Sequence, residues 1–154
     1  MRAGLAARGA LGQARVMRQT STELVIATPG QGLHEITDAV LRWVEDSAIE
    51  TGLLTLFVRH TSASLLIQEN AAPAARRDLE RYFAKIAPES AGYEHDDEGP
   101  DDMPAHLRAA LTATSLSIPV TGGRPVLGTW QGIYVFEHRT SAHRRRVAVH
   151  LMGA

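Results

Sequence analysis

Histidine is the main candidate for metal or acid–base chemistry in this chain, which has seven histidines and no cysteine in 154 residues. Without cysteine, disulfides, cysteine metal sites and thiol nucleophiles are excluded. His60 ends an apolar stretch typical of a strand, His95 lies in an acidic segment, and His106 follows four residues after Asp102. Three imidazoles can hold one ion and leave a coordination position open. We therefore interpret His60, His95 and His106 as candidate ligands of one divalent metal, zinc or magnesium; the alternative for His60 is a buried side chain bonded to the backbone.

Carboxylates are concentrated between Tyr93 and Asp102, where six of ten residues are Asp or Glu. A run of this kind is usually a solvated loop or a set of caps for the next helix. Because residues four apart share one side of a helical turn, Asp102 is also placed to orient His106 or to share a cation with it. The candidate catalytic residues are accordingly His60, His106 and Asp102.

Four arginines fall within eight residues near the C-terminus: Arg139, Arg144, Arg145 and Arg146. Guanidinium groups bind phosphate through paired hydrogen bonds, so Arg139, Arg144 and Arg145 are the candidate phosphate-binding residues. Two alternatives are a solvated hairpin tip and a contact with the acidic segment of a neighbouring subunit.

Two other features have weaker chemical interpretations. The stretch from Gly128 to Gly132 surrounds Trp130 with glycines but lacks the spacing of a nucleotide-binding loop. Such glycines favour a bulge or a close approach between strands, and we expect Trp130 in the core or in an interface. Glu69 ends an alternating apolar row, so we expect it in water at a sheet edge or paired with a histidine or arginine in a cleft.

The charge and hydropathy of the chain exclude several partners. Lys and Arg number 16 against 17 Asp and Glu, for a net charge of −1, which argues against nucleic acid as an obligatory partner. No apolar run approaches the length of a membrane span, and Arg8 interrupts the stretch that would serve as a signal peptide. We therefore expect no membrane partner and a cytoplasmic location.

Hydrophobic periodicity predicts one α+β domain over residues 14–154, preceded by a disordered extension over residues 1–13. The core is expected to be a mostly antiparallel, β-sandwich-like arrangement of about seven strands with two to three helices. The expected helices cover residues 36–49, 71–87 and a short stretch from residue 102. The expected strands cover 15–28, 53–60, 62–69, 116–120, 125–129, 131–138 and 145–151.

Five segments in order resemble a known family: His60-Thr61-Ser62-Ala63-Ser64-Leu65, Tyr93-Glu94-His95-Asp96, Asp101-Asp102-Met103-Pro104-Ala105-His106-Leu107, Gly128-Thr129-Trp130-Gln131-Gly132-Ile133 and Glu137-His138-Arg139. The chain is similar in these segments to the YjbQ-like family, labelled secondary thiamine-phosphate synthase. The resemblance runs from about residue 15 to the C-terminus. It implies a β-sandwich-like fold, a homotrimer, and a polar pocket lined by the quoted histidines and sometimes occupied by metal.

The activity implied by the resemblance is thiamine phosphate formation, in which a thiazole phosphate displaces diphosphate from an activated pyrimidine. Two alternatives stay open: a metal-dependent hydrolase of a small phosphorylated metabolite, and a non-enzymatic trimeric ligand-binding protein. All three predict a small-molecule ligand, and the two enzymatic ones predict a divalent metal.

Overall fold

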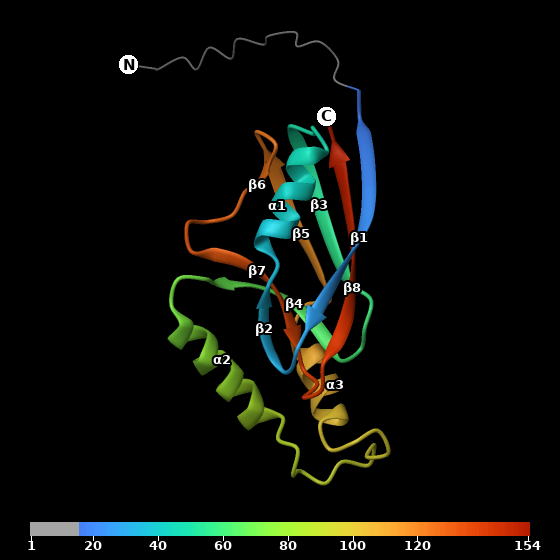
Figure 1. Ribbon diagram of the computed structural model, residues 1–154, viewed down its shortest axis with the longest axis vertical. Helices are drawn as coiled ribbons and strands as arrows, with labels where there is room; N and C mark the ends of the chain where they lie inside the picture. The colour runs from blue at the N-terminus through green and yellow to red at the C-terminus, as the bar shows by residue number, and fades with distance from the viewer. Residues whose placement is uncertain (1–15) are drawn as a thin grey trace, which may run out of the picture.

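Two antiparallel sheets and three helices make up the fold (Figure 1). The computed structural model describes residues 16–154, so the extension predicted for residues 1–13 lies outside the described residues. The strands are β1 (Arg18–Thr28), β2 (Gly32–Glu35), β3 (Thr51–Val58), β4 (Ala63–Glu69), β5 (Ser115–Thr121), β6 (Arg124–Pro125), β7 (Gln131–Glu137) and β8 (His143–Gly153). The helices are α1 (Thr37–Asp46), α2 (Pro73–Ile86) and α3 (Asp102–Leu111).

The strand order is β1-β8-β3-β5-β6 in the larger sheet and β2-β7-β4 in the smaller one. Every strand pair is antiparallel, which confirms the predicted α+β class. Two details differ from the expectation. The short strand β2 was not predicted, and the strand expected over 125–129 stops at Pro125, because the Leu127 backbone N–H bonds back to the Pro125 carbonyl and turns the chain away.

Alternating burial explains why the larger sheet covers a core. In β8, Arg145, Val147, Val149 and Leu151 are buried while the residues between them are half-buried or exposed. Because successive side chains of a strand point to opposite faces, these four lie on the inner face. The inner residues of β3 and the apolar stripe of α1, with Val40 and Val44, complete the same core.

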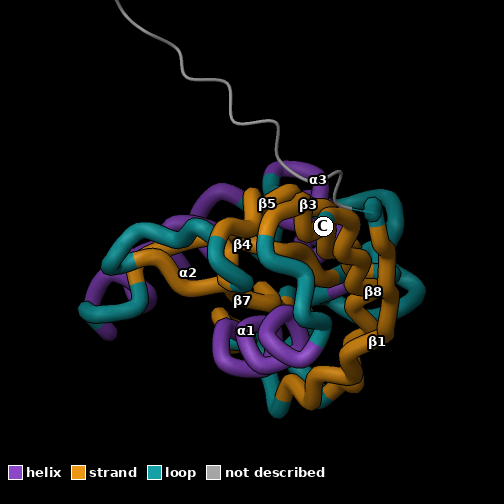
Figure 2. The backbone as a smooth tube through the Cα atoms, turned by 90° about the horizontal axis from the view of Figure 1, so that it is seen from above, coloured by secondary structure: helices purple, strands orange, loops and turns teal. Residues whose placement is uncertain are grey.

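Strand β7 is buried along both faces from Gly132 onward, because it lies between the core and α2. The Phe83 ring of α2 meets the Phe136 ring of β7 edge to face, with centroids 5.2 Å apart. Seen from above, α2 lies at the side of the molecule away from β1 and β8 (Figure 2). No helix of the described residues is long and apolar enough to span a membrane.

One buried ion pair joins the two sheets. The fully buried carboxylate of Glu137, at the end of β7, accepts hydrogen bonds from Arg145 Nε at 2.6 Å and Arg145 Nη2 at 2.5 Å. It also accepts one from Thr28 Oγ1 of β1 at 2.6 Å. Burial opposes the ionisation of Glu137, but the hydrogen bonds from Arg145 and Thr28 outweigh it and lower the pKa of the carboxyl group below its ordinary value. The pair is therefore ionised and saturated with donors.

His138 follows this carboxylate and is also fully buried. Its Nε2 lies 2.9 Å from Ser64 Oγ, and its ring lies 4.4 Å from the ring of Phe136, centroid to centroid. Burial, with a further contribution from the positive charge of Arg108, lowers the pKa of His138 to about 3. The side chain is therefore a neutral part of the core.

The Glu137–Arg145 pair gives a prediction for stability. Glu137→Gln leaves the Arg145 guanidinium buried without its counter-charge, so we expect a loss of about 3–5 kcal/mol in the free energy of unfolding. Glu23→Gln, which removes an exposed partner of Arg59 and Arg146, is the matched control and should cost less than about 1 kcal/mol. Urea unfolding followed by circular dichroism measures both. Equal, small losses in the two variants would contradict this account of the pair.

The pKa of His138 gives a second prediction, for pH dependence. The unfolded chain takes up a proton at this histidine below pH 6.5, whereas the folded chain does so only near pH 3, so stability falls as the pH falls between these values. The slope contributed by this residue approaches ~1.4 kcal/mol per pH unit. In His138→Gln, which does not titrate, the free energy of unfolding should depend less steeply on pH between 6.5 and 4. An unchanged slope in the urea midpoints would show that this histidine titrates normally in the fold.

Candidate metal centre

The first turn of α3 and the loop before it bring together two histidines and one carboxylate. Asp102 and His106 lie one helical turn apart, and His106 Nε2 is 3.2 Å from Asp102 Oδ2. The loop that precedes α3 places His95 Nε2 at 3.0 Å from the same oxygen. The ligand atoms of all three residues lie within 4.8 Å of one another. In Figure 1, α3 and the loop before it lie at the bottom of the molecule.

The positions of the hydrogen atoms show why this group favours a cation. His106 Nδ1 lies 3.1 Å from the Thr61 carbonyl oxygen, which can only accept, so Nδ1 must carry the hydrogen. In a neutral ring the lone pair of Nε2 then faces the negatively charged Asp102 oxygen. For His95 both ring nitrogens face carboxylate oxygens, since Nδ1 lies 3.1 Å from Asp97 Oδ1. A bound cation, or protonation of both rings, would relieve this repulsion between acceptors.

The spacing of the ligand atoms suits a small divalent metal. Zinc bonds of 2.0–2.2 Å with tetrahedral angles put neighbouring ligand atoms roughly 3.3 Å apart. The two nitrogen–oxygen distances of 3.0 and 3.2 Å come close to this value. The Asp102 side chain is 3% exposed, whereas those of His95 and His106 are 41% and 31% exposed, so a metal held here faces solvent on the imidazole side. Water or a substrate can reach that side.

Asp102 is fixed in place by a second layer of charges. Arg139 Nη1 binds the outer oxygen of Asp102, Oδ1, while Arg139 Nε donates to Asp101 Oδ2 at 3.0 Å. Asp101 Oδ2 also accepts from the backbone N–H of Thr140 at 2.8 Å and from its hydroxyl at 3.0 Å. Partial burial opposes the ionisation of Asp101, but these donors outweigh it and lower its pKa to about 2. The inner oxygen, Asp102 Oδ2, is thereby left to face the histidines.

His60, the third predicted metal ligand, is not in the group of three. Its Nε2 accepts a hydrogen bond of 2.9 Å from the backbone N–H of Arg146, which leaves the proton on Nδ1. Burial, helped by nearby positive charge such as that of Arg145, lowers the pKa of His60, so the ring is neutral at pH 7. His60 lines a neighbouring hollow of about 550 Å³ together with Thr61, whose carbonyl bonds to His106. The sequence predicted His60 as a metal ligand, whereas in the structure Asp102 takes its place in the group with His95 and His106.

The predicted arginine cluster divides into residues with different partners. Arg145 is buried with Glu137, and Arg139 is bound to Asp101 and Asp102. Arg144 is exposed and makes no side-chain hydrogen bond to any other described residue. Sequence reasoning missed the roles of Arg139, Arg145 and Asp101. Strand alternation could have found the role of Arg145, because it shares the inward phase of Val147 and Val149.

Comparison with known proteins agrees with the fold and identifies the family of the chain. Residues 22–154 match the family described as UPF0047 protein YjbQ-like. The UPF0047 protein sll1880 of Synechocystis sp. is 51% identical over 93% of this chain and 98% of its own length. The UPF0047 protein YjbQ of Escherichia coli O157:H7 is 44% identical over 84% of this chain and 95% of its own length.

A solved structure supports the same relationship. The crystal structure of a YbjQ-like protein of unknown function from Sulfolobus solfataricus P2 superposes with a TM-score of 0.84 at 26% identity, covering 90% of this chain and 100% of that one. The match of the family model spans most of the chain, and the sequence relatives are matched over nearly their whole length. The chain therefore belongs to the UPF0047 YjbQ-like family.

Proposed function

We propose that the chain is a metal-dependent enzyme that acts on a small phosphorylated metabolite. The observation that carries this proposal is the convergence of His95 Nε2 and His106 Nε2 on one oxygen of a buried aspartate, Asp102. With a neutral His106 ring the arrangement is unfavourable, because its Nε2 lone pair faces the Asp102 carboxylate, and a cation between them would relieve this repulsion. A divalent ion there would supply Lewis-acid activation of a water molecule or of a phosphate oxygen.

The donor set favours zinc over magnesium. Two imidazole nitrogens and one carboxylate oxygen are the ligands of several catalytic zinc sites, whereas magnesium prefers oxygen ligands and keeps several waters. The exposed carboxylates of the same loop, such as Asp96 and Asp97, are a separate source of oxygen ligands for magnesium. Zinc is therefore our first assignment for the centre, and magnesium held by the loop is the second.

The hollow beside the centre offers room and hydrogen-bond donors for the substrate. Its lining includes His60, whose Nδ1–H makes no hydrogen bond to the other described residues, and the hydroxyl-bearing Thr61 and Ser62. Arg59, whose side chain is 56% exposed, also lines the hollow but already pairs with Glu23 at 2.8 Å. The hollow therefore suits a ligand with an oxygen that accepts from neutral His60.

Hydrolysis is the reaction that the geometry supports best. In it, a water oxygen attacks phosphorus, the bond to the leaving oxygen breaks, and that oxygen takes up a proton. Displacement of diphosphate requires strong cationic binding of the leaving group, and two of the three arginines predicted for that task are already neutralised by carboxylates. A single phosphate group makes a smaller demand, which a metal at the centre and a hydrogen bond from His60 would meet.

Thiamine-phosphate synthase-type transfer remains the second candidate. The acidic loop supports it, because a magnesium ion on Asp96 or Asp97 would bring a diphosphate next to the centre. In that reaction a thiazole nitrogen forms a bond to the pyrimidine methylene carbon while the carbon–oxygen bond to diphosphate breaks.

The homotrimer and the cytoplasmic location are also part of the proposal. Exposed apolar residues on the outer face of the larger sheet, Leu53, Phe57 and Met152, support association through that face.

Metal binding provides the first test of this proposal. Purified protein that has been incubated with zinc sulfate and desalted should retain one zinc ion per chain. Inductively coupled plasma mass spectrometry measures this zinc content. Asp102→Asn and His106→Ala should weaken zinc binding by more than about 100-fold in competition with a chelator, and Arg139→Met by about 10- to 100-fold. His34→Ala, which removes a histidine bonded to the Gly30 carbonyl, is the control and should bind like the unmodified chain. No retained zinc, or equal affinity in Asp102→Asn, would refute the centre.

The reaction itself is tested with two substrates in parallel. Release of phosphate from a phosphomonoester panel by the zinc-loaded protein would support hydrolysis. Formation of thiamine phosphate from the pyrimidine diphosphate and thiazole phosphate with magnesium would support transfer. In either case Asp102→Asn and His106→Ala should lower kcat/KM by at least about 100-fold, whereas His34→Ala should leave it unchanged. Turnover that survives the loss of Asp102 would place the reaction outside this centre. Zinc binding with no turnover of any substrate would favour a ligand-binding protein over an enzyme.

A further inference from the structure

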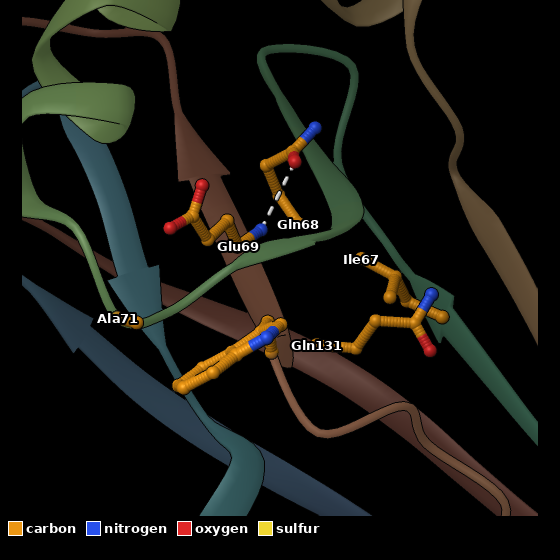
Figure 3. A pocket seen from close by; sticks show the side chains of 6 residues that line it. Ile67, Gln68, Glu69, Ala71 and Gln131 are labelled. Atoms are coloured by element: carbon orange, nitrogen blue, oxygen red, sulfur yellow. Dashed lines mark hydrogen bonds between the residues drawn. The ribbon is translucent and has the colours of Figure 1, made fainter.

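A second pocket lies at the other end of the smaller sheet, away from the metal centre (Figure 3). It has a volume of about 550 Å³ and is lined by Ile67, Gln68, Glu69, Ala71, Trp130 and Gln131. In the β4–β7 ladder, Glu69 pairs with Gln131 at this end, while Ala63 pairs with Glu137 at the other. Six residues of strand correspond to roughly 20 Å. The pocket is therefore separate from the centre within one chain.

The indole of Trp130 forms an exposed aromatic wall of the pocket. This residue is 64% exposed although tryptophan carries a large apolar surface. The backbone on either side is held firmly: the Trp130 carbonyl accepts from the Asn70 N–H at 3.0 Å, and the Gln131 N–H donates to the Gly128 carbonyl at 3.0 Å. The Gly128 N–H donates in turn to Gln131 Oε1 at 2.7 Å. The closed turn thus holds the base of an exposed ring, which excludes the core position and leaves the interface position of the two that were expected.

The polar groups of the pocket have unused hydrogen-bonding capacity. The Glu69 carboxylate makes no hydrogen bond or ion pair with any other described residue. The carboxamide oxygen of Gln68 accepts from the Glu69 backbone N–H at 3.0 Å, as the dashed line in Figure 3 shows, and that of Gln131 accepts from Gly128. Neither amide NH₂ group donates to another described residue. One anionic acceptor and two amide donors therefore remain available among the residues that line the pocket with Trp130.

We propose that this pocket binds a flat, positively charged nitrogen heterocycle. The face of an indole attracts cations and stacks on flat rings, which selects the shape and charge of the ligand. Glu69 supplies the counter-charge and accepts from a ring or exocyclic N–H, while an amide NH₂ of Gln68 or Gln131 donates to a ring acceptor. A pocket of this volume holds a small molecule. The assignment does not depend on the metal centre, because none of its residues contributes to that centre.

Fluorescence of Trp130 allows a direct test with the full-length protein. The chain has two tryptophans, and Trp43→Phe leaves Trp130 as the only one. Protonated 4-aminopyridine at pH 7 is the probe, and cyclohexylammonium, a cation without a flat ring, is its matched comparison. We expect saturable quenching by 4-aminopyridine, confirmed by calorimetry, and at least tenfold weaker binding of cyclohexylammonium.

Two variants assign the binding to this pocket. Glu69→Gln should weaken the binding of 4-aminopyridine by about tenfold. Trp130→Leu should abolish this binding, which is measured by calorimetry because the variant lacks the fluorescent ring. Glu45→Gln, on α1 and outside the pocket lining, is the control and should not change the affinity. Purely linear, collisional quenching would overturn the proposal, as would equal binding of the two cations or unchanged affinity in Glu69→Gln. Shielding of Trp130 from acrylamide in the protein without probe would also overturn it, because a second copy of the chain would then cover the ring.

Discussion

The carboxylate of Glu137 lies without solvent contact between two sheets, and the structure depends on its neutralisation there. Arg145 comes from the larger sheet and approaches it with two nitrogens, and Thr28 adds a hydroxyl from β1. A buried charge without such partners costs several kcal/mol, so the packing of the two sheets favours the arrangement that brings Glu137 of β7 against Arg145 of β8. The pair thus sets how β7 faces the larger sheet.

The same carboxylate connects the fold to the candidate metal centre. Glu137 Oε1 accepts the backbone N–H of Arg139 at 2.9 Å, which fixes the start of the residue whose guanidinium binds Asp101 and Asp102. Asp102 is therefore oriented by a chain of charges that begins in the core. This explains how a carboxylate on a short helix and a histidine on a long loop can be held in one arrangement. The Trp130 pocket, at the opposite end of β7, is positioned by its own turn and not by this chain.

Local patterns in the sequence were sufficient for most elements and for part of the centre. Helical spacing alone pairs Asp102 with His106, and alternation places the inner residues of β3 and β8. The proximity of His95 does not follow from spacing, because a long loop decides it; it was suggested by the metal-binding chemistry of the histidines and by the resemblance to a family. A contact between the arginine cluster and the acidic segment was expected between subunits, and Arg139 makes it within the chain. Strand alternation predicts that Arg145 points inward, but it does not identify Glu137 as its partner. For Trp130 the core, one of the two expected positions, is excluded because its turn exposes a residue whose size favours burial.

The central claim is that His95, His106 and Asp102 hold one metal ion. Anomalous diffraction at the zinc edge, from crystals of the zinc-loaded protein, tests it most directly. The account predicts one strong peak per chain, bonded to His95 Nε2, His106 Nε2 and Asp102 Oδ2 at roughly 2.0–2.2 Å. A peak on His60 instead, or no peak between these three side chains, would contradict it.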